Sequence, residues 1–382
     1  MPFATTDPPM ERARLVAAHL DGLYSVTELA DRFGVSRPTV YKWIERYREG
    51  GATALADRSH ARHEQRHRTC PEAERLIVEA RRAHPSWGAR KLLPYLAHRH
   101  DGVAWPAAST AAEILSRHGL TKPRRKRRPP KHPGSIPLAA DTPNAVWTTD
   151  FKGQFRLGDG ELCYPLTVCD AHSRFILSCH GLLSVEQYAA LKQFERLFTE
   201  YGLPLAIRSD NGVPFATQAL CGLSRLSVWW IKLGIDHHRI DPGQPQQNGS
   251  HERMHKTLAA DTTRPPEADM ARQQSRFDDW RVEFNDDRPH EALEYATPGS
   301  IYVPSPRPMP AVLPEPEYPG HFEVRYLSKD GNVRFKGHQT FVSQTLSHEH
   351  IGLEETADGV WDLYFFDRLL ARLDERTWKL TA

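Results

Sequence analysis

The chain has 382 residues, of which 39% are hydrophobic and 9% aromatic, so it is long enough for two or three domains with hydrophobic cores and is not a disordered protein. It contains no run of 18 apolar residues and no basic N-terminal stretch followed by an apolar one. We therefore expect neither a membrane span nor a secretory signal.

The charges are distributed unevenly along the chain. Residues 1–134 contain 25 Lys and Arg against 14 Asp and Glu, whereas the remainder contains 25 basic and 34 acidic residues. This asymmetry indicates a polyanion-binding module at the N-terminus, although basic arms of this kind also bind membranes or acidic proteins.

The cysteines form neither a disulfide pattern nor a zinc-binding pattern. Their number is odd, and no two of them stand as C-x-x-C. We expect reduced thiols in a cytoplasmic protein at all five positions: Cys70, Cys163, Cys169, Cys179 and Cys221.

Residues 1–60 predict two short helices joined by a tight turn. Ser25 and Glu28 have the spacing of a capping box, and Gly34 permits a sharp turn before a second helix that Ser36 can cap. This pattern favours a helix-turn-helix, whose second helix enters the major groove of DNA, over an ordinary helical hairpin. The DNA-facing side chains are then expected to be Arg37, Thr39, Lys42 and Arg46.

Residues 61–120 predict a second helical domain. Leu76–Ala80 and Ala107–His118 carry apolar residues suited to buried helix faces. A second DNA-binding module and a domain that only packs fit this pattern equally well. Three histidines beside arginines indicate a solvated basic stretch rather than a metal cluster, because no cysteine or carboxylate arrangement supports a metal: His60, His63 and His67.

Residues 121–141 predict a basic, proline-rich linker. The stretch Thr121–Gly134 contains seven Lys or Arg and four prolines. Proline removes backbone donors and like charges repel, so we expect an extended segment without a core of its own. Five of its side chains are expected to contact DNA phosphates: Arg124, Arg125, Lys126, Arg127 and Arg128.

Residues 142–303 predict a mixed α/β domain with three prominent acids. Asp150 lies in a predicted strand rich in β-branched and aromatic residues, and Asp210 ends a second short apolar strand. Glu252 stands where a helix begins, after the polar loop Pro242–Gly249. An ionised carboxylate among buried residues is costly unless it is paired or bound to a metal, so these acids are candidate metal ligands.

Two further strands and a helix are predicted between the first two acids. The strands lie near Tyr164–Cys169 and Arg174–His180. The helix is expected to be capped by Ser184 and Gln187. Its core face is expected to contain Val185, Tyr188, Leu191, Phe194 and Phe198.

A Pro-rich linker, residues 304–319, precedes a C-terminal segment, residues 320–382, that predicts a small β-barrel or sandwich. Lys329–Gly331 and Ala357–Gly359 have the composition of hairpin turns. The expected strands include Phe322–Tyr326, Asn332–Phe335 and Val360–Phe366.

The three acidic motifs resemble the catalytic core of retroviral integrases and related bacterial insertion-sequence transposases. The matching phrases are Trp147-Thr-Thr-Asp150, Ser209-Asp-Asn-Gly212, and Pro245-Gln-Gln-Asn-Gly249 with His251-Glu-Arg-Met-His255. The resemblance covers residues 145–300 and extends to the helix-turn-helix, which stands in place of the zinc-binding module of retroviral integrases. It implies a ribonuclease-H-like catalytic domain with a mixed sheet, in a DNA transposase that binds the terminal inverted repeats of a mobile element and joins them to new DNA.

The resemblance also implies a cofactor and the roles of the acids. In this family the three acids hold two Mg²⁺ ions, which Mn²⁺ can replace; Asp150 would bridge both ions, and Asp210 and Glu252 would each complete one. Lys256 lies four residues after Glu252 and would hold a DNA phosphate, unless it is an ordinary solvent-exposed lysine. The implied partners are double-stranded DNA, at element ends and target, and further copies of the chain in a homodimer or higher homo-oligomer at the nucleoid, with no membrane.

The spacing departs from the family pattern at one point. Asp210 and Glu252 are separated by 41 residues, more than the mid-thirties usual in the family, and we expect the extra length in a loop at Leu220–Ser227. Other acids have structural interpretations: Asp170 in a turn between strands, and Asp286 and Asp287 as helix-terminal charges.

Two other functions fit parts of the pattern. A sequence-specific DNA-binding regulator with a lapsed core is disfavoured by the three intact acids. A site-directed nuclease on the same fold is disfavoured by the combination of a helix-turn-helix and a basic linker, although fold analogy alone would not separate it from a transposase.

The linker generates a testable prediction. Replacing Arg124, Arg125, Lys126, Arg127 and Arg128 together with alanine should weaken binding to any duplex, since each neutralises phosphate charge. The slope of log affinity against log salt should fall by roughly 0.9 for each phosphate that is no longer neutralised. A slope that does not change would make this segment a solubilising charge tract.

Overall fold

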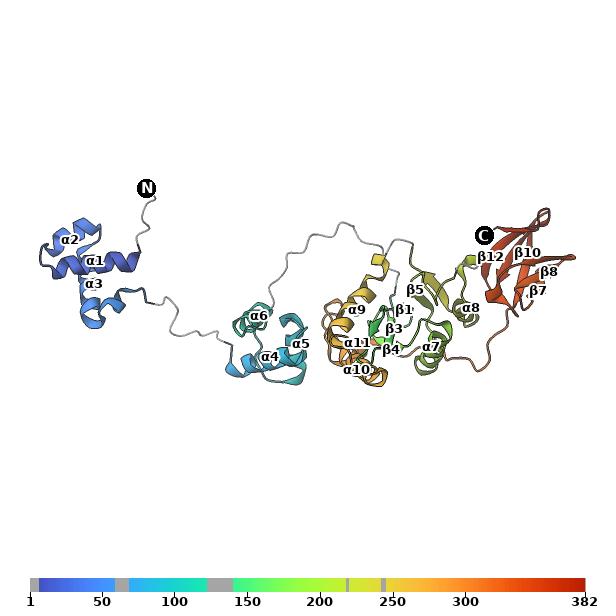
Figure 1. Ribbon diagram of the computed structural model, residues 1–382, viewed down its shortest axis with the longest axis horizontal. Coiled ribbons are helices and arrows are strands. Elements are labelled where there is room, and N and C mark those ends of the chain that lie inside the picture. The colour runs from blue at the N-terminus through green and yellow to red at the C-terminus, as the bar shows by residue number, and fades with distance from the viewer. Residues whose placement is uncertain (1–6, 59–68, 122–139, 218–219, 242–244, 382) are drawn as a thin grey trace. The chain divides into compact units, whose positions relative to one another are not determined.

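The computed structural model describes residues 7–58, 69–121, 140–217, 220–241 and 245–381 (Figure 1). They fall into two compact units, one within Met1–Arg68 and the other within Thr69–Ala382. Within the described ranges, no helix has the length and apolar character needed to cross a membrane. The linker side chains Arg124–Arg128 and the three histidines His60, His63 and His67 lie outside these ranges, and the domain boundaries stay predictions.

The first unit is a three-helix domain with a helix-turn-helix. It contains α1 (Pro8–Leu20), α2 (Val26–Phe33), α3 (Arg37–Gly50) and the 3₁₀ turn η1 (Ala52–Leu55). The capping box of α2 is confirmed: the Ser25 hydroxyl accepts from the amide of Glu28, and the Glu28 carboxylate accepts from the amide of Ser25. Gly34 ends α2 in the left-handed conformation, with φ of 62°, which makes the sharp turn possible.

The cap of α3 differs in detail from the prediction. Ser36 occupies the N-cap position, but its side chain makes no hydrogen bond to a helix amide. The Ser36 hydroxyl instead lies 2.9 Å from the hydroxyl of Thr39. Pro38 near the start of the helix removes one of the amides that would otherwise need a cap.

The second unit begins with three helices around a small core of their own. These are α4 (Pro71–Ala83), α5 (Ala89–Arg99) and α6 (Ala108–Arg117). Ile77, Trp87, Leu92 and Ile114 are buried in one cluster. The residues predicted to be buried belong to the same cluster: Leu76, Val78, Ala80, Ile114 and Leu115.

A mixed sheet forms the centre of the second unit. The strands are β1 (Val146–Phe151), β2 (Phe155–Arg156), β3 (Leu162–Asp170), β4 (Ile176–Leu182), β5 (Ala206–Ser209) and β6 (Asp236–Arg239). β3 pairs antiparallel with β1, β2 and β4, whereas β1–β5 and β5–β6 are parallel pairs. A mixed sheet was predicted, and the structure confirms it.

Helices cover both faces of this sheet (Figure 1). α7 (Gln187–Tyr201) and α8 (Arg225–Lys232) pack on the face that carries Trp147, Val168 and Ile207. α9 (Gly249–Thr262) and α10 (Met270–Val282) pack on the opposite face, against Cys169 and Ile176. The π-helix η4 (Glu283–Asp287) and the short helix α11 (Pro298–Ile301) complete the domain.

Two predictions about α7 are wrong in detail. The N-cap is Glu186, so neither Ser184 nor Gln187 caps the helix. Tyr188 is 71% exposed rather than in the core. The buried face instead contains Ala190, and Tyr188 precedes that residue by two positions, about 200° around the helix. The remaining buried positions of α7 are Phe194, Leu197 and Phe198.

The C-terminal domain is an antiparallel β-structure, as predicted. One sheet has the strand order β13 (Lys379–Thr381), β12 (Arg368–Asp374), β11 (Val360–Phe365), β10 (His350–Ala357) and β7 (Glu323–Tyr326). β8 (Asn332–Phe335) and β9 (His338–Phe341) form a separate hairpin. The segment 304–319 that precedes the domain is described throughout and contains neither helix nor strand.

Leu220–Ser227, the stretch expected to form an extra loop between Asp210 and Glu252, is partly helical. It contains the 3₁₀ turn η2 (Leu220–Gly222) and the start of α8. Leu223, Val228 and Ile231 belong to the hydrophobic core of the C-terminal domain, beside Leu353 and Phe365. The segment between Asp210 and Glu252 therefore also holds the C-terminal domain against the central one.

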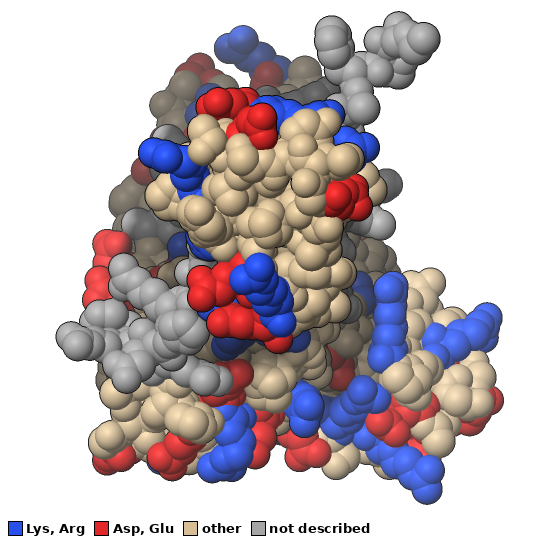
Figure 2. All heavy atoms as spheres, turned by 90° about the vertical axis from the view of Figure 1, so that its left-hand side faces the viewer, with Lys and Arg blue, Asp and Glu red and all other residues tan. Residues whose placement is uncertain are grey.

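Charge is mixed rather than segregated on the described surface of the first unit. Residues 7–58 contain eight Lys or Arg and eight Asp or Glu. Figure 2 shows basic and acidic side chains interspersed on the face that it draws. The positive excess of the N-terminal third therefore resides elsewhere, chiefly in the seven basic residues of Thr121–Gly134.

The two N-cap serines form a matched pair for testing the helix-turn-helix. Ser25→Ala should destabilise α2 by about 1 kcal/mol, because it removes the acceptor of a first-turn amide. Ser36→Ala should have a smaller effect on α3, because Ser36 bonds only another hydroxyl. Hydrogen exchange of peptides covering each helix in the full chain measures both effects, with about fivefold faster exchange expected in α2. Equal acceleration in both variants would contradict this assignment of the caps.

Candidate active site

The parallel pairing of β1 with β5 brings Asp150 and Asp210 together. The register pairs Val146 with Ala206 and Thr148 with Arg208, so two residues further along each chain Asp150 stands opposite Asp210. Directly opposed residues on neighbouring strands lie on the same face of a sheet. Both acids thus project from the carboxyl ends of adjacent strands toward the face covered by α9.

Burial and mutual repulsion disfavour the charged forms of these acids. The pKa of Asp150 is raised to about 7, first by burial and then by the negative charges of Asp210 and Glu252. Burial also raises the pKa of Asp210, although the amide of Gly212 donates to its carboxylate at 3.2 Å. A Cβ atom on Gly212 would lie 3.0 Å from Asp210 Oδ2, so glycine leaves that oxygen open.

Two histidines attach the first turns of α9 to the sheet. His251 lies with Nδ1 2.9 Å from the Thr148 hydroxyl and Nε2 2.7 Å from the Thr167 hydroxyl, and His255 Nε2 is also 2.7 Å from Thr167. The Thr167 hydroxyl donates to the carbonyl of Asp150, so it accepts from both rings. Both rings then carry the proton on Nε2, and α9 is fixed directly beside Asp150.

The contact between His255 and Asp150 is not an ion pair. His255 Nδ1 lies 3.8 Å from Asp150 Oδ2. Burial, followed by the charge of Lys152, lowers the pKa of His255 to about 4, so the ring is neutral at pH 7. The histidines therefore hold the helix without neutralising the acids.

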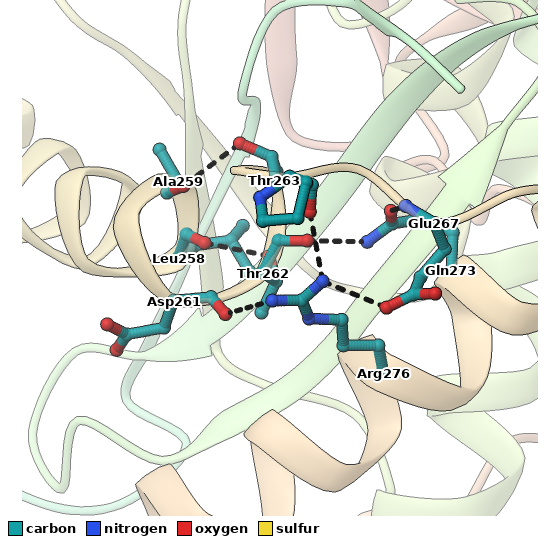
Figure 3. Close-up of polar contacts among 9 residues, drawn as sticks. Leu258, Ala259, Asp261, Thr262, Thr263, Glu267, Gln273 and Arg276 are labelled. Carbon is teal, nitrogen blue, oxygen red and sulfur yellow. Dashed lines mark hydrogen bonds and ion pairs between the residues drawn. The ribbon is translucent and has the colours of Figure 1, made fainter. Parts of the chain in front are cut away.

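The far end of α9 is fixed by Arg276 of α10 (Figure 3). Its guanidinium donates to the carbonyls of Asp261 and Pro265, both at 2.9 Å, and to the Glu267 carboxylate at 2.8 Å. Gln273 also donates to the carbonyl of Thr262 and accepts from the amide of Glu267. With both ends attached, α9 has a defined position on the sheet.

Glu252 lies in the first turn of α9, next to His251. Its side chain is exposed, as is that of Lys256 one turn later. Glu252 is close enough to Asp150 to raise the pKa of that acid. In the part of the chain that the structure describes, however, no three His, Cys, Asp or Glu side chains are gathered closely enough to hold a metal ion.

The donor chemistry of the site nevertheless fits a hard divalent cation. All three acids offer carboxylate oxygens, the ligands that Mg²⁺ prefers. Because burial and the charges of Asp210 and Glu252 raise the pKa of Asp150, a cation held there would stabilise its ionised form. Asp150 and Asp210 are already side by side, whereas Glu252 must approach them to share one ion.

The polar loop before α9 is attached to the end of β5. Arg208 donates to the carbonyl of Gln247 at 2.9 Å, and the Gln247 amide donates to Asp241 at 2.6 Å. Asn211 donates to the carbonyl of Ile240 at 2.7 Å. The residues flanking Asp210 therefore also determine where α9 begins.

Comparison with known families matches the sheet and the helical domains separately. Integrase core domain families match residues 140–245 and 233–298. A helix-turn-helix domain family matches residues 11–63, and a homeodomain-like domain family matches residues 39–115. The chain therefore carries helix-turn-helix domains and an integrase core domain.

Similar proteins include those of two bacterial insertion elements. The uncharacterized 39.2 kDa protein of IS476 from Xanthomonas euvesicatoria is 24% identical over 226 residues, which cover 59% of this chain and 63% of that protein. The uncharacterized 31.7 kDa protein of IS407 from Burkholderia multivorans is 29% identical over 163 residues, covering 42% and 55% respectively. The chain thus spans 55–63% of the length of these two relatives.

Solved structures of viral integrases are also similar at low identity. The simian T-cell lymphotropic virus intasome in complex with PP2A regulatory subunit B56 gamma matches with 17% identity and a TM-score of 0.38, covering 77% of this chain and 97% of that one. The HTLV-2 integrase catalytic core domain in complex with magnesium matches with 16% identity and a TM-score of 0.34, covering 43% and 99%.

The predicted DNA-facing residues of α3 differ in how far contacts within the domain already occupy their side chains. Arg37 and Lys42 are exposed, with the Lys42 ammonium 5.3 Å from the Trp43 ring, and Thr39 is half-buried beside Ser36. Arg46 stacks 4.7 Å from the Trp43 ring and donates to the carbonyl of Ala56. Arg46 therefore joins α3 to the segment after η1, which leaves fewer of its donors free.

Sequence reasoning did not assign the residues that position α9 in the integrase core. His251 and His255 belong to the motif His251-Glu-Arg-Met-His255, but neither was predicted to have a role. Their spacing with Met254 and Leu258 is that of a buried helix face, and all but His255 are buried. A buried polar residue at such a position needs a partner, which is the signal that could have identified Thr148 and Thr167.

Thr167 and Thr149 provide a matched test of this attachment. Thr167→Val should lower the free energy of unfolding of the integrase core by about 1–3 kcal/mol, because the imidazole N–H groups of the buried His251 and the half-buried His255 lose their shared acceptor. Thr149→Val should be nearly neutral, because the buried Thr149 hydroxyl has no hydrogen-bond partner in the described structure. Urea unfolding followed by tryptophan fluorescence compares them, and equal destabilisation by the two variants would contradict the proposed attachment.

Proposed function

We propose that this protein is a DNA transposase that binds the terminal inverted repeats of a mobile element and catalyses DNA cleavage and strand transfer. The observation that carries the proposal is the placement of Asp150 opposite Asp210 on parallel strands, with Glu252 on a helix fixed beside them. This arrangement occurs in an integrase core that follows helix-turn-helix domains. A binding protein alone has no need to bury two adjacent carboxylates.

The acids are proposed to hold two Mg²⁺ ions, or Mn²⁺ in their place. Asp150 would contact both ions, and Asp210 and Glu252 would each provide a further carboxylate ligand to one of the two ions. When bound, the ions supply positive charge to the attacking and leaving oxygens of a phosphodiester and activate water or a 3′-hydroxyl. Because the histidines are neutral, the chain's own contribution is a concentrated negative charge that selects divalent cations.

The remaining residues are proposed to bind and position DNA. Arg37, Thr39, Lys42 and Arg46 would face a duplex at the element end, where α3 enters the major groove. Arg124–Arg128 would contact phosphates, and Lys256 would hold one close to Glu252. Cleaving and joining two ends requires two sites, so we propose that a homodimer or larger homo-oligomer assembles on the DNA.

The acids are tested by isosteric neutral substitutions. Asp150→Asn, Asp210→Asn and Glu252→Gln should each abolish joining of an end-bearing oligonucleotide in Mg²⁺ or Mn²⁺. Affinity for that oligonucleotide should stay within about twofold of the parent, since recognition resides in the N-terminal helices. Asp358→Asn is the control, because Asp358 is an exposed acid in a hairpin turn of the C-terminal domain.

Each pattern of results has a distinct meaning. Joining by Glu252→Gln at the parent's rate would show that the third ligand is misassigned. Cleavage without joining by the parent would favour a nuclease. Specific end binding by a parent that neither cleaves nor joins would favour a regulator with a lapsed core.

A further inference from the structure

A pocket adjoins the first turn of α9, and none of the three candidate acids lines it. It has a volume of about 460 Å³, and α9 contributes Gly249, Ser250, His251 and Arg253 to its lining. The end of β3 contributes Asp170, and Arg174 follows it in the turn. The segment after η4 contributes Arg288 and His290. None of these basic residues has a role in the function proposed above.

The cationic side chains of this pocket are not neutralised. Arg174 and Arg253 form no ion pair within the described residues, and the guanidinium of Arg288 approaches only Asp261, at 3.7 Å. Asp170 lines the same pocket, but its carboxylate already accepts from the amides of Asn144 and Ser173 and from the Ser173 hydroxyl. Lys91 adds a further cation to the lining, and the second lining carboxylate, Glu291, pairs with Arg90 at 3.3 Å. The pocket therefore has a positive excess.

One buried donor in the pocket lacks a partner. The Arg288 side chain is only 10% exposed, and its Nε has no hydrogen-bond partner in the described structure. His290 Nε2 is also buried without a partner, but this ring is neutral and its other nitrogen donates to the backbone of Phe284, so Nε2 is an acceptor. Leaving a buried donor unsatisfied costs about 1–3 kcal/mol, more for a charged group. The Arg288 guanidinium therefore requires an acceptor that comes from outside the described chain.

We propose that this pocket binds a phosphate group of a DNA strand next to the active site. A phosphate oxygen can accept a hydrogen bond from the buried Arg288 guanidinium, and its charge suits Arg174 and Arg253. The pocket also includes the start of α9, a 14-residue helix whose free amides and dipole favour an anion. Both carboxylates of the described lining are engaged, Asp170 by backbone amides and Glu291 by Arg90, so the remaining charge of the site favours an anion.

The source of the phosphate is inferred from position. Arg253 follows Glu252 directly, so a phosphate held here lies on the same helical turn as the third acid. A DNA strand passing the active site would present its neighbouring phosphates to this turn of α9, and a free phosphate would meet the same side chains, so the experiment below includes both. This inference rests on the proposed function, because it takes DNA to be the ligand.

The test uses the full chain with Arg174→Gln, Arg253→Gln and the double variant. Arg272→Gln is the control: it removes the same charge from α10, where the side chain is 70% exposed and paired with Asp269. Binding of a duplex oligonucleotide is measured across a salt series. Each single variant should lower the slope of log affinity against log salt by about 0.9, and the double variant by no more, since both arginines serve one phosphate. Arg272→Gln should leave the slope unchanged.

A second measurement separates DNA from free phosphate. Inorganic phosphate, compared with chloride at equal ionic strength, should raise the Tm of the parent and of Arg272→Gln but not of the double variant. If the phosphate effect follows the arginines while the DNA slopes do not change, the pocket is a free-phosphate site and the DNA assignment is overturned. If neither quantity depends on Arg174 and Arg253, the pocket binds no phosphate. If the proposed function is wrong, Asp150→Asn will join DNA at the same rate as the parent. The binding measurements described here do not depend on that result.

Discussion

The parallel pairing of β1 with β5 determines where two of the three candidate acids of the integrase core lie. It places Asp150 and Asp210 at neighbouring strand ends on one face of the sheet, where both are half-buried. The attachment of α9 is compatible with this negative charge because it uses neutral groups. Burial lowers the pKa of His251 well below its usual range, so His251 and His255 bind Thr148 and Thr167 as uncharged rings. A lysine or arginine in their place would have neutralised the acids and removed the reason for a cation to bind.

The first turn of α9 consequently separates two sites of opposite charge. The buried acids lie on the side of Asp150, and Arg174, Arg253 and Arg288 line the pocket beside the other end of the turn. Screening by solvent is weak for partly buried charges, so such sites keep separate preferences over a short distance. A phosphodiester needs both, with cations at the reacting group and cationic side chains at a neighbouring phosphate. The hydrogen bonds of Arg276 at the far end of α9 fix the helix and therefore the positions of the two sites relative to each other.

Local sequence patterns predicted the individual helices, strands and turns but not which of them pair or make contact. The capping box at Ser25, the buried strand before Asp150 and the structural turn at Asp170 were predicted because each depends on a few adjacent residues. The opposition of Asp150 and Asp210 depends on which strands pair, and only the resemblance to integrases indicated it. The buried face of α7 was misjudged because Tyr188 has the spacing to extend the apolar stripe, although it lies about 200° around the helix from the buried Ala190. The hydrogen bonds between Thr167 and two histidines more than 80 residues away could not be predicted from the residues around Thr167 or from those around the histidines.

The distribution of charge suggests how affinity and specificity are divided in this chain. Counterion release contributes to DNA affinity in proportion to the phosphates neutralised, and it carries no sequence information. The described helix-turn-helix domain holds equal numbers of basic and acidic residues, so it gains little from this effect as a whole. In the proposed function, the linker Thr121–Gly134, with seven basic residues, is suited to supply that affinity while α3 reads base edges. A transposase of the kind proposed could then bind an end specifically and still engage target DNA of unrelated sequence, because the linker and the phosphate pocket would contact only the backbone.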